Sequence, residues 1–183
     1  MQYAAARKHV LSLLPKGSVG AEIGVWKGDY SAEILSHVRP CQLHLIDPWQ
    51  LRAEDSHAQA WYGTARGVDM EAVAAEVLNR FAQEITAGQV VVHRANSAEI
   101  LPGLENLDFV YVDGDHHYPA VRADLDMAFT ATRSGGLICI DDHQIGKWWG
   151  DGIVRATNEF LGAHSAHVEV LFCYGHQMVV RRR

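Results

Sequence analysis

The chain has 183 residues, of which 48% are hydrophobic and 21% charged, and its formal net charge is −6. This length predicts one domain over residues 1–183, large enough to bury a substantial core. The negative charge and the lack of a basic stripe argue against a nucleic-acid partner, and no apolar run approaches the roughly 20 residues that a membrane helix requires.

The cysteines and the first residues predict the compartment. Three widely spaced cysteines without a CxxC pair are typical of a reducing environment. Segment 1–18 lacks the long apolar stretch and cleavage site of a secretory signal. Val10, Leu11 and Leu14 instead predict a short amphipathic helix there. We therefore expect a cytoplasmic protein.

Short β-rich runs alternate along the chain with longer segments of helical period. Strands are predicted at 19–23, 42–47, 89–93, 107–112, 136–140, 168–173 and 177–181, and helices at 69–86, 119–132 and 152–162. Five strands separated by helices indicate a parallel, doubly wound sheet. The four residues CYGH between the last two strands indicate a hairpin. The predicted fold is α/β, with a Rossmann-like seven-stranded sheet that is mostly parallel and ends in an antiparallel hairpin.

The first predicted strand leads into a glycine turn, AEIGVWKGDYS at 21–31, which precedes a helix. A dinucleotide fingerprint needs glycines close together, so that the backbone can approach a pyrophosphate. Here bulky residues such as Trp26 fill the turn between Gly24 and Gly28. A nucleoside cofactor without phosphates tolerates that turn. An ordinary strand-to-helix turn capped by Asp29 would have the same sequence.

Two acids favour a cationic nucleoside cofactor. Glu22, in the first strand, suits a cofactor that carries an ammonium group. Asp47 ends the second strand, about 20 residues further on, where an acid can accept hydrogen bonds from both ribose hydroxyls. The alternative for Asp47 is a strand-end turn before Pro48.

Three more acids follow two later strands. Asp113 closes LDFVYVDGD, and Asp141 and Asp142 close GGLICIDDH. Because the carboxyl ends of adjacent parallel strands meet at one edge of a sheet, these carboxylates can converge. With waters and a substrate oxygen they would suit Mg²⁺ or another divalent cation. They could also be turn and capping residues on an acidic surface, or orient a substrate hydroxyl directly.

Together these segments resemble the class I S-adenosylmethionine-dependent methyltransferases. The chain is most similar to the small-molecule O-methyltransferase family that includes the macrocin-type enzymes acting on antibiotic sugars. The resemblance runs from Gly20 to Leu161 and rests on AEIGVWKGDYS, the strand-end Asp47, RANSAEILP, DFVYVDGDHHYPAVRADL, GGLICIDDH and GIVRATNEFL. Many relatives carry a histidine before the second acid, and the metal is not used by every member of the class.

The resemblance implies S-adenosylmethionine as cofactor. It implies a methionine moiety near Glu22 and Gly24, a ribose at Asp47, and an adenine near Asn96 and Ser97, although the last two would also suit the cap of a short turn. Asp115 and His116 could contact the cofactor, surround the metal or hold the loop. The cofactor-binding residues expected are Glu22, Gly24, Gly28, Asp47, Asn96, Ser97, Asp113, Asp115 and His116. The metal ligands expected are Asp113, Asp141 and Asp142.

The expected reaction is an in-line displacement in which the protein positions the reactants and makes the acceptor oxygen nucleophilic. A metal on that hydroxyl would lower its pKa, and a general base could share the task. His57, His117 and His143 are the candidate bases, and Asp113 joins His57 and His143 as a catalytic candidate. Each histidine could instead be a loop residue without a catalytic role.

Two irregular segments, 48–68 and 143–152, carry most of the tryptophans. Trp49, Trp61, Tyr62, Trp148 and Trp149 would form aromatic walls for a sugar ring, a phenol or a polyketide face, or would plug the edge of the sheet. The predicted function is a metal-assisted O-methyltransferase for a hydroxylated small molecule.

Two other classes of function stay open. A nicotinamide-dependent oxidoreductase is disfavoured by the filled glycine turn. A nucleoside-binding scaffold without activity is disfavoured because it would not need Asp113, Asp141 and Asp142 at strand ends. The sequence does not identify the acceptor, the ion or the oligomeric state, and a homo-oligomer is compatible with it.

Overall fold

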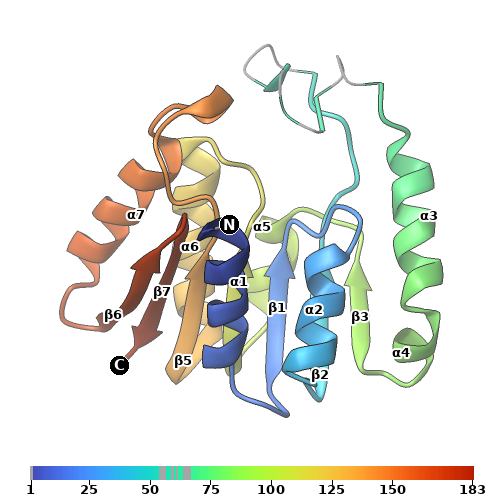
Figure 1. The fold of residues 1–183 in the computed structure, drawn as a ribbon, viewed down its shortest axis with the longest axis horizontal. Coiled ribbons are helices and arrows are strands. Elements are labelled where there is room, and N and C mark those ends of the chain that lie inside the picture. The colour runs from blue at the N-terminus through green and yellow to red at the C-terminus, as the bar shows by residue number, and fades with distance from the viewer. Residues whose placement is uncertain (1, 54–56, 59, 61, 64–66) are drawn as a thin grey trace.

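The computed structural model describes residues 2–53, 57–58, 60, 62–63 and 67–183. One seven-stranded sheet has the order β3-β2-β1-β4-β5-β7-β6 (Figure 1). The strands are β1 (Val19–Ile23), β2 (Gln42–Ile46), β3 (Val90–His93), β4 (Leu107–Val112), β5 (Thr132–Ile140), β6 (Val168–Tyr174) and β7 (Gln177–Arg182). Strands β1 to β5 pair in parallel, and β7 runs antiparallel to both β5 and β6. The predicted mixed sheet with its terminal hairpin is confirmed.

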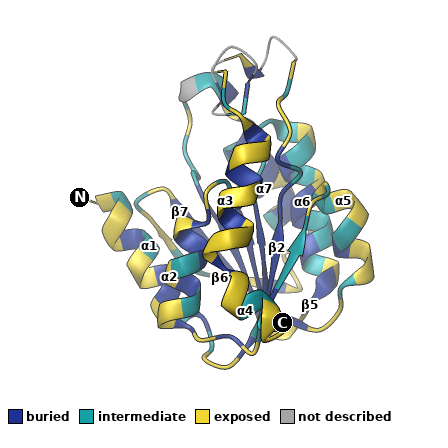
Figure 2. Ribbon diagram, turned by 90° about the vertical axis from the view of Figure 1, so that its right-hand side faces the viewer, coloured by how far each residue is buried: buried dark blue, intermediate teal, exposed yellow. Residues whose placement is uncertain are grey.

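Helices cover both faces of this sheet (Figures 1 and 2). They are α1 (Gln2–Leu13), α2 (Asp29–His37), α3 (Met70–Arg80), α4 (Ala82–Thr86), α5 (Ser97–Ile100), α6 (Tyr118–Ala131) and α7 (Gly152–Ala163), with 3-10 turns at Leu101–Gly103 and Lys147–Trp149. Helices α1, α2 and α3 pack on one face, and α6 and α7 on the other. Among the described residues, no helix has the length and apolar character needed to cross a membrane.

The central strands are buried on both faces, which explains their nearly continuous apolar sequences. In β4, Phe109 and Tyr111 pack on the side of α1 to α3, while Val110 and Val112 pack on the side of α6 and α7. Figure 2 shows the sheet edge-on as a buried layer between helices with exposed outer faces. This alternation leaves the strand ends as the places where polar side chains gather.

Two predicted elements differ from those observed by more than one residue at an end. The helix predicted at 69–86 is divided at Phe81, whose backbone leaves the helical region (φ −105°, ψ 20°). The Phe81 side chain is buried against the turn at Gly28, where an added Cβ would lie 2.6 Å from its ring. The strand predicted at 136–140 begins earlier, at Thr132, because an irregularity in the β4–β5 register accommodates the glycines that look like a turn.

The sheet order also determines where a ligand can bind. Strand β1 has β2 as its neighbour on one side and β4 on the other, so the chain leads from β1 outward to β2 and β3 and then returns to β4 beside β1. At such a switch point the loops after the two strands diverge, and a crevice forms outside their carboxyl ends. The loops after β1 and β4 lie at this end of the sheet in Figure 1.

Candidate active site

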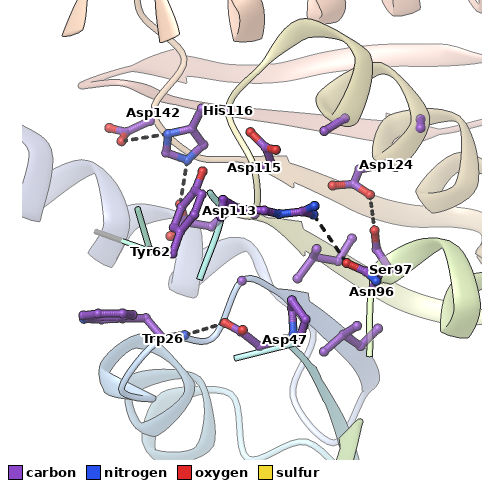
Figure 3. Close-up of a pocket in the computed structure, with 18 of the residues that line it drawn as sticks. Trp26, Asp47, Tyr62, Asn96, Ser97, Asp113, Asp115, His116, Asp124 and Asp142 are labelled. Atoms are coloured by element: carbon purple, nitrogen blue, oxygen red, sulfur yellow. Dashed lines mark hydrogen bonds and ion pairs between the residues drawn. The ribbon is translucent and has the colours of Figure 1, made fainter. Parts of the chain in front are cut away.

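A pocket of about 1120 Å³ opens at the carboxyl ends of β1, β2 and β4. Small-molecule sites usually enclose roughly 300–1,000 Å³, so there is room for a nucleoside cofactor and an acceptor. The predicted site residues in its lining are Gly24, Asp47, Asn96, Ser97, Asp113, Asp115, His116 and Asp142. Figure 3 labels all of these except Gly24. Those outside its lining are Glu22, Gly28, His57, Asp141 and His143.

The glycine turn brings the β1 backbone against the end of β4. Gly24 has φ +84°, and a Cβ there would lie 2.0 Å from the carbonyl oxygen of Asp113. Only glycine fits, since both the conformation and the contact exclude a side chain. Gly28, at φ +74°, is the N-cap of α2 and lies outside the pocket lining.

Asp47 holds the glycine turn in place. Its Oδ2 accepts hydrogen bonds from the backbone N–H groups of Val25 (3.0 Å) and Trp26 (2.9 Å). Its Oδ1 accepts one from the N–H of Trp49 at 2.7 Å. A carboxylate offers about four acceptor positions, so Asp47 can organise the turn and still accept a further hydrogen bond from a ligand.

Glu22 lies beneath the pocket and not in its wall. Its side chain is 1% exposed, and Oε2 accepts a hydrogen bond from the Ser31 hydroxyl at 2.5 Å. Burial raises the pKa of Glu22 to about 8, so the carboxyl is mostly neutral at pH 7. In this position Glu22 supports the packing of α2 on β1.

Asn96 and Ser97 lie at the start of α5 and also line the pocket. Asn96 is the N-cap, and its backbone N–H donates to the Glu99 carboxylate at 3.1 Å. The Ser97 hydroxyl donates to Asp124 on α6. Burial raises the pKa of Asp124 to about 6. Asn96 therefore caps α5 and also lines the pocket.

Asp141 is buried and is held by protein groups. Its carboxylate accepts hydrogen bonds from the hydroxyls of Tyr3 (3.0 Å) and Tyr111 (2.8 Å) and from the amide of Gln177. It also accepts from the backbone N–H of Asp142 at 2.6 Å. These contacts use most of its acceptor positions.

Arg7 of α1 brings a positive charge to the same acids. Its guanidinium lies 3.4 Å from Asp113 Oδ2 and 3.3 Å from Asp141 Oδ2. It also stacks on Tyr30, with 4.0 Å from Cζ to the ring centroid. Burial and the neighbouring Asp141 raise the pKa of Asp113, and Arg7 offsets part of this effect. Asp113, Asp141 and Asp142 therefore do not fit a shared metal ion in this arrangement, because Arg7 already contacts two of them.

His116 lies between two of the predicted acids, as Figure 3 shows. Its Nε2 is 3.5 Å from Asp113 Oδ1, and its Nδ1 is 3.9 Å from Asp142 Oδ2. The ring stacks on Trp148 at 5.7 Å between centroids and meets Trp149 edge-on at 4.7 Å. A histidine in the pocket wall between two carboxylates can act as a general base, and the carboxylates can stabilise the positive charge that it gains.

The other candidate bases lie elsewhere. His143 follows the acid pair, but its backbone N–H binds the carbonyl of His176 at 2.9 Å and its side chain is outside the pocket lining. Burial lowers the pKa of His143. His57 and His117 both lie 2.9 Å from the Asp115 carboxylate, and neither is in the pocket lining.

Comparison with known proteins identifies the family. Residues 21–143, more than half of the chain, match a family model described as a methyltransferase domain. The chain belongs to this methyltransferase-domain family. This match confirms the expectation of a class I S-adenosylmethionine-dependent methyltransferase, and the seven-stranded sheet agrees with it. It does not test the resemblance to the macrocin-type enzymes.

Solved structures share the fold at low sequence identity. A candidate rRNA methylase from Clostridium thermocellum aligns with a TM-score of 0.68 and 11% identity over 98% of this chain and 94% of its own. The O-methyltransferase TomG from Streptomyces achromogenes, in complex with SAM, aligns with a TM-score of 0.63 and 16% identity over 100% of this chain and 81% of its own. The N-methyltransferase NodS from Bradyrhizobium japonicum aligns with a TM-score of 0.62 and 14% identity over 98% of this chain and 94% of its own.

One curated protein is related in sequence over a shorter stretch. It is an uncharacterized protein of Acanthamoeba polyphaga mimivirus, 33% identical over 82 residues. The match covers 41% of this chain and 37% of the viral protein.

Aromatic side chains form part of the pocket of this methyltransferase. Trp26, Tyr62, Trp148 and Trp149 line it. Trp49, which was expected in the wall, is 2% exposed, and its indole N–H donates to the Trp26 carbonyl at 2.8 Å. Trp61 lies outside the described residues.

Several side chains of this site could not be predicted from local sequence. Tyr3 and Arg7 have the i, i+4 spacing of one helix face, which was the only signal that they act together. Their contacts with β4 and β5 join residues more than a hundred positions apart. Tyr111 and Gln177 were predicted only as strand residues, yet they hold Asp141.

Proposed function

We propose that this methyltransferase transfers a methyl group from S-adenosylmethionine to a hydroxyl of a small molecule, with residues 1–183 acting as one domain. The observation that carries the proposal is His116, placed in the pocket wall between Asp113 and Asp142 and beside Trp148. A base, two acids and an aromatic wall meet close to the glycine turn at the strand ends. This combination suits a polar acceptor whose proton must be removed.

The cofactor end of the pocket is proposed at the β1 and β2 strand ends. Gly24 allows close approach of a ligand, and Asp47 can accept a ribose hydroxyl. Asn96 and Ser97 line the side proposed for the adenine. The TomG structure, which shares the fold, is a complex with SAM, and this supports the choice of cofactor. When bound, S-adenosylmethionine supplies the methyl group from its sulfonium.

The acceptor end is proposed at His116. The His116 ring would accept the proton of the acceptor hydroxyl as the new carbon–oxygen bond forms and the carbon–sulfur bond breaks. Asp113 and Asp142 on either side would stabilise the imidazolium that results. Trp148 and Tyr62 would orient the acceptor by ring contacts. A sugar, as in the macrocin-type enzymes, a phenol or another natural product fits this description.

Metal assistance at Asp113, Asp141 and Asp142, which the sequence predicts, is not part of this proposal. A cation held by these acids would have to displace the Arg7 guanidinium, and Asp141 would have to give up hydrogen bonds from Tyr3 and Tyr111. No catalytic step is therefore assigned to a metal at these acids.

A screen with methyl-labelled S-adenosylmethionine tests the proposal. Hydroxylated sugars and phenols are offered to the wild type, to His116→Gln and to His37→Gln, whose exposed histidine on α2 is the matched control. We expect label on an acceptor oxygen, and about a 10²–10⁴-fold lower kcat for His116→Gln, with binding of S-adenosylhomocysteine retained. Label only on nitrogen or carbon acceptors, or full activity of His116→Gln, would contradict the proposal.

A further inference from the structure

A second cluster of polar side chains lies beside the pocket and is separate from the three acids. It consists of His57, from the loop after β2, and of Asp115 and His117, from the loop between β4 and α6. His57 Nε2 lies 2.9 Å from Asp115 Oδ2, and His117 Nδ1 lies 2.9 Å from Asp115 Oδ1. One nitrogen or oxygen of each residue lies within 4.8 Å of the other two.

The surroundings shield this cluster from water in part. His57 is buried, and the other two residues are half-buried. The two histidine rings pack at 4.3 Å between centroids, and the Trp148 ring lies 5.2 Å from His117. The Tyr62 ring lies 5.9 Å from His57. Aromatic rings therefore lie beside a site whose three donor atoms are all within 4.8 Å of one another.

The chemistry of the donors selects the ligand. Two imidazole nitrogens and one carboxylate oxygen are a donor set that Zn²⁺ and neighbouring transition metals prefer. Mg²⁺ and Ca²⁺ prefer sites built from oxygen atoms. Each histidine can present the required lone pair as a neutral ring whose proton lies on the other nitrogen.

We propose that His57, Asp115 and His117 bind a divalent transition-metal ion, Zn²⁺ in the first instance, with a water completing the coordination. The ion would join the loop after β2 to the loop after β4. Since Asp115 also lines the methyl-transfer pocket, together with Tyr62 and Trp148, the ion would fix the wall against which the acceptor binds. Metal binding does not rest on the proposed function; only the effect on acceptor binding does.

The test is a titration of tag-free, EDTA-dialysed protein with Co²⁺, followed by its visible absorption, and then displacement by Zn²⁺. We expect one ion per chain in the wild type and a higher Tm with Zn²⁺. We expect neither in His57→Gln or His117→Gln, while both variants still bind S-adenosylhomocysteine, which shows that they are folded.

Two further variants locate the ion. His44→Gln alters a different histidine pair, in which His44 Nδ1 lies 2.9 Å from His93 Nε2, and should keep Co²⁺ binding. Asp142→Asn should keep it as well. No Co²⁺ or Zn²⁺ binding, binding that survives both His57→Gln and His117→Gln, or binding lost in Asp142→Asn would each overturn the proposal. Methyl transfer by a protein that binds no metal would leave the proposed function intact.

Discussion

Glu22 and Asp47 are acids at the ends of neighbouring strands, and their surroundings give them different chemistry. Asp47 accepts three backbone hydrogen bonds, which favour its charged form and oppose the effect of burial. Glu22 has the Ser31 hydroxyl as its hydrogen-bond partner in the interior, and burial dominates, raising its pKa to about 8. A cofactor ammonium is therefore less suited to Glu22 than the sequence implied.

The raised pKa of Glu22 predicts a pH-dependent stability. Because the folded pKa of about 8 lies above the ordinary value of 4.5, the folded state binds the proton more tightly. The resulting stabilisation is complete below the ordinary pKa and is lost as the pH rises through about 8. At about 1.4 kcal/mol per pKa unit, the loss amounts to a few kcal/mol.

Urea unfolding of the wild type and Glu22→Gln at several pH values measures this effect. The free energy of unfolding of the wild type should fall relative to the variant between pH 5 and pH 8. Glu33→Gln, at an exposed position on α2, should follow the wild type. Parallel curves for the wild type and Glu22→Gln would show that Glu22 is charged in the fold.

At the scale of elements, α1 contributes to the site as well as covering the sheet. It places Arg7 against Asp113 and Asp141, and the Tyr3 hydroxyl on Asp141. A cation from the first helix therefore compensates acids at the ends of β4 and β5. The loss of this cation would remove a positive charge from beside one buried and one half-buried carboxylate.

Arg7→Met should lower the free energy of unfolding by about 1–3 kcal/mol, since it removes the ion pairs with Asp113 and Asp141. Arg94→Met is the matched control, because Arg94 pairs with Glu71 at the surface, where an ion pair contributes little to stability. This variant should unfold like the wild type. Combining Arg7→Met with Asp113→Asn should recover part of the loss. Equal stability of Arg7→Met and wild type, measured by urea unfolding, would mean that the ion pairs contribute nothing.

The elements differ in how far the sequence predicts them. The bounds of β1 and β4 agree with the prediction, because strands buried on both faces are continuous apolar runs. The break at Phe81 was not predicted, since this residue fits the helical period and is turned by a contact with the distant glycine turn. The part that α1 plays in the site was also missed, because local periodicity shows that a helix is amphipathic but not what it covers.

At the scale of the whole molecule, topology places the pocket and leaves the acceptor open. Gly24, Asp47 and Asp113 could be assigned to one crevice from the sequence because parallel strands end at the same edge. The position of His116 between two acids depends on loop geometry, which the sequence does not specify. Structures with this fold carry names for rRNA, oxygen and nitrogen methylation, so the fold alone does not select the acceptor.

The central claim is that the crevice at Gly24 binds a nucleoside cofactor that carries no phosphates. Calorimetric titration with S-adenosylhomocysteine and, separately, with NADH tests it most directly. Gly24→Ala should abolish binding, since its Cβ would lie 2.0 Å from the Asp113 carbonyl oxygen, whereas Gly162→Ala, in open space on α7, should not. We predict micromolar affinity for S-adenosylhomocysteine and none for NADH; binding of NADH without binding of S-adenosylhomocysteine would contradict the account.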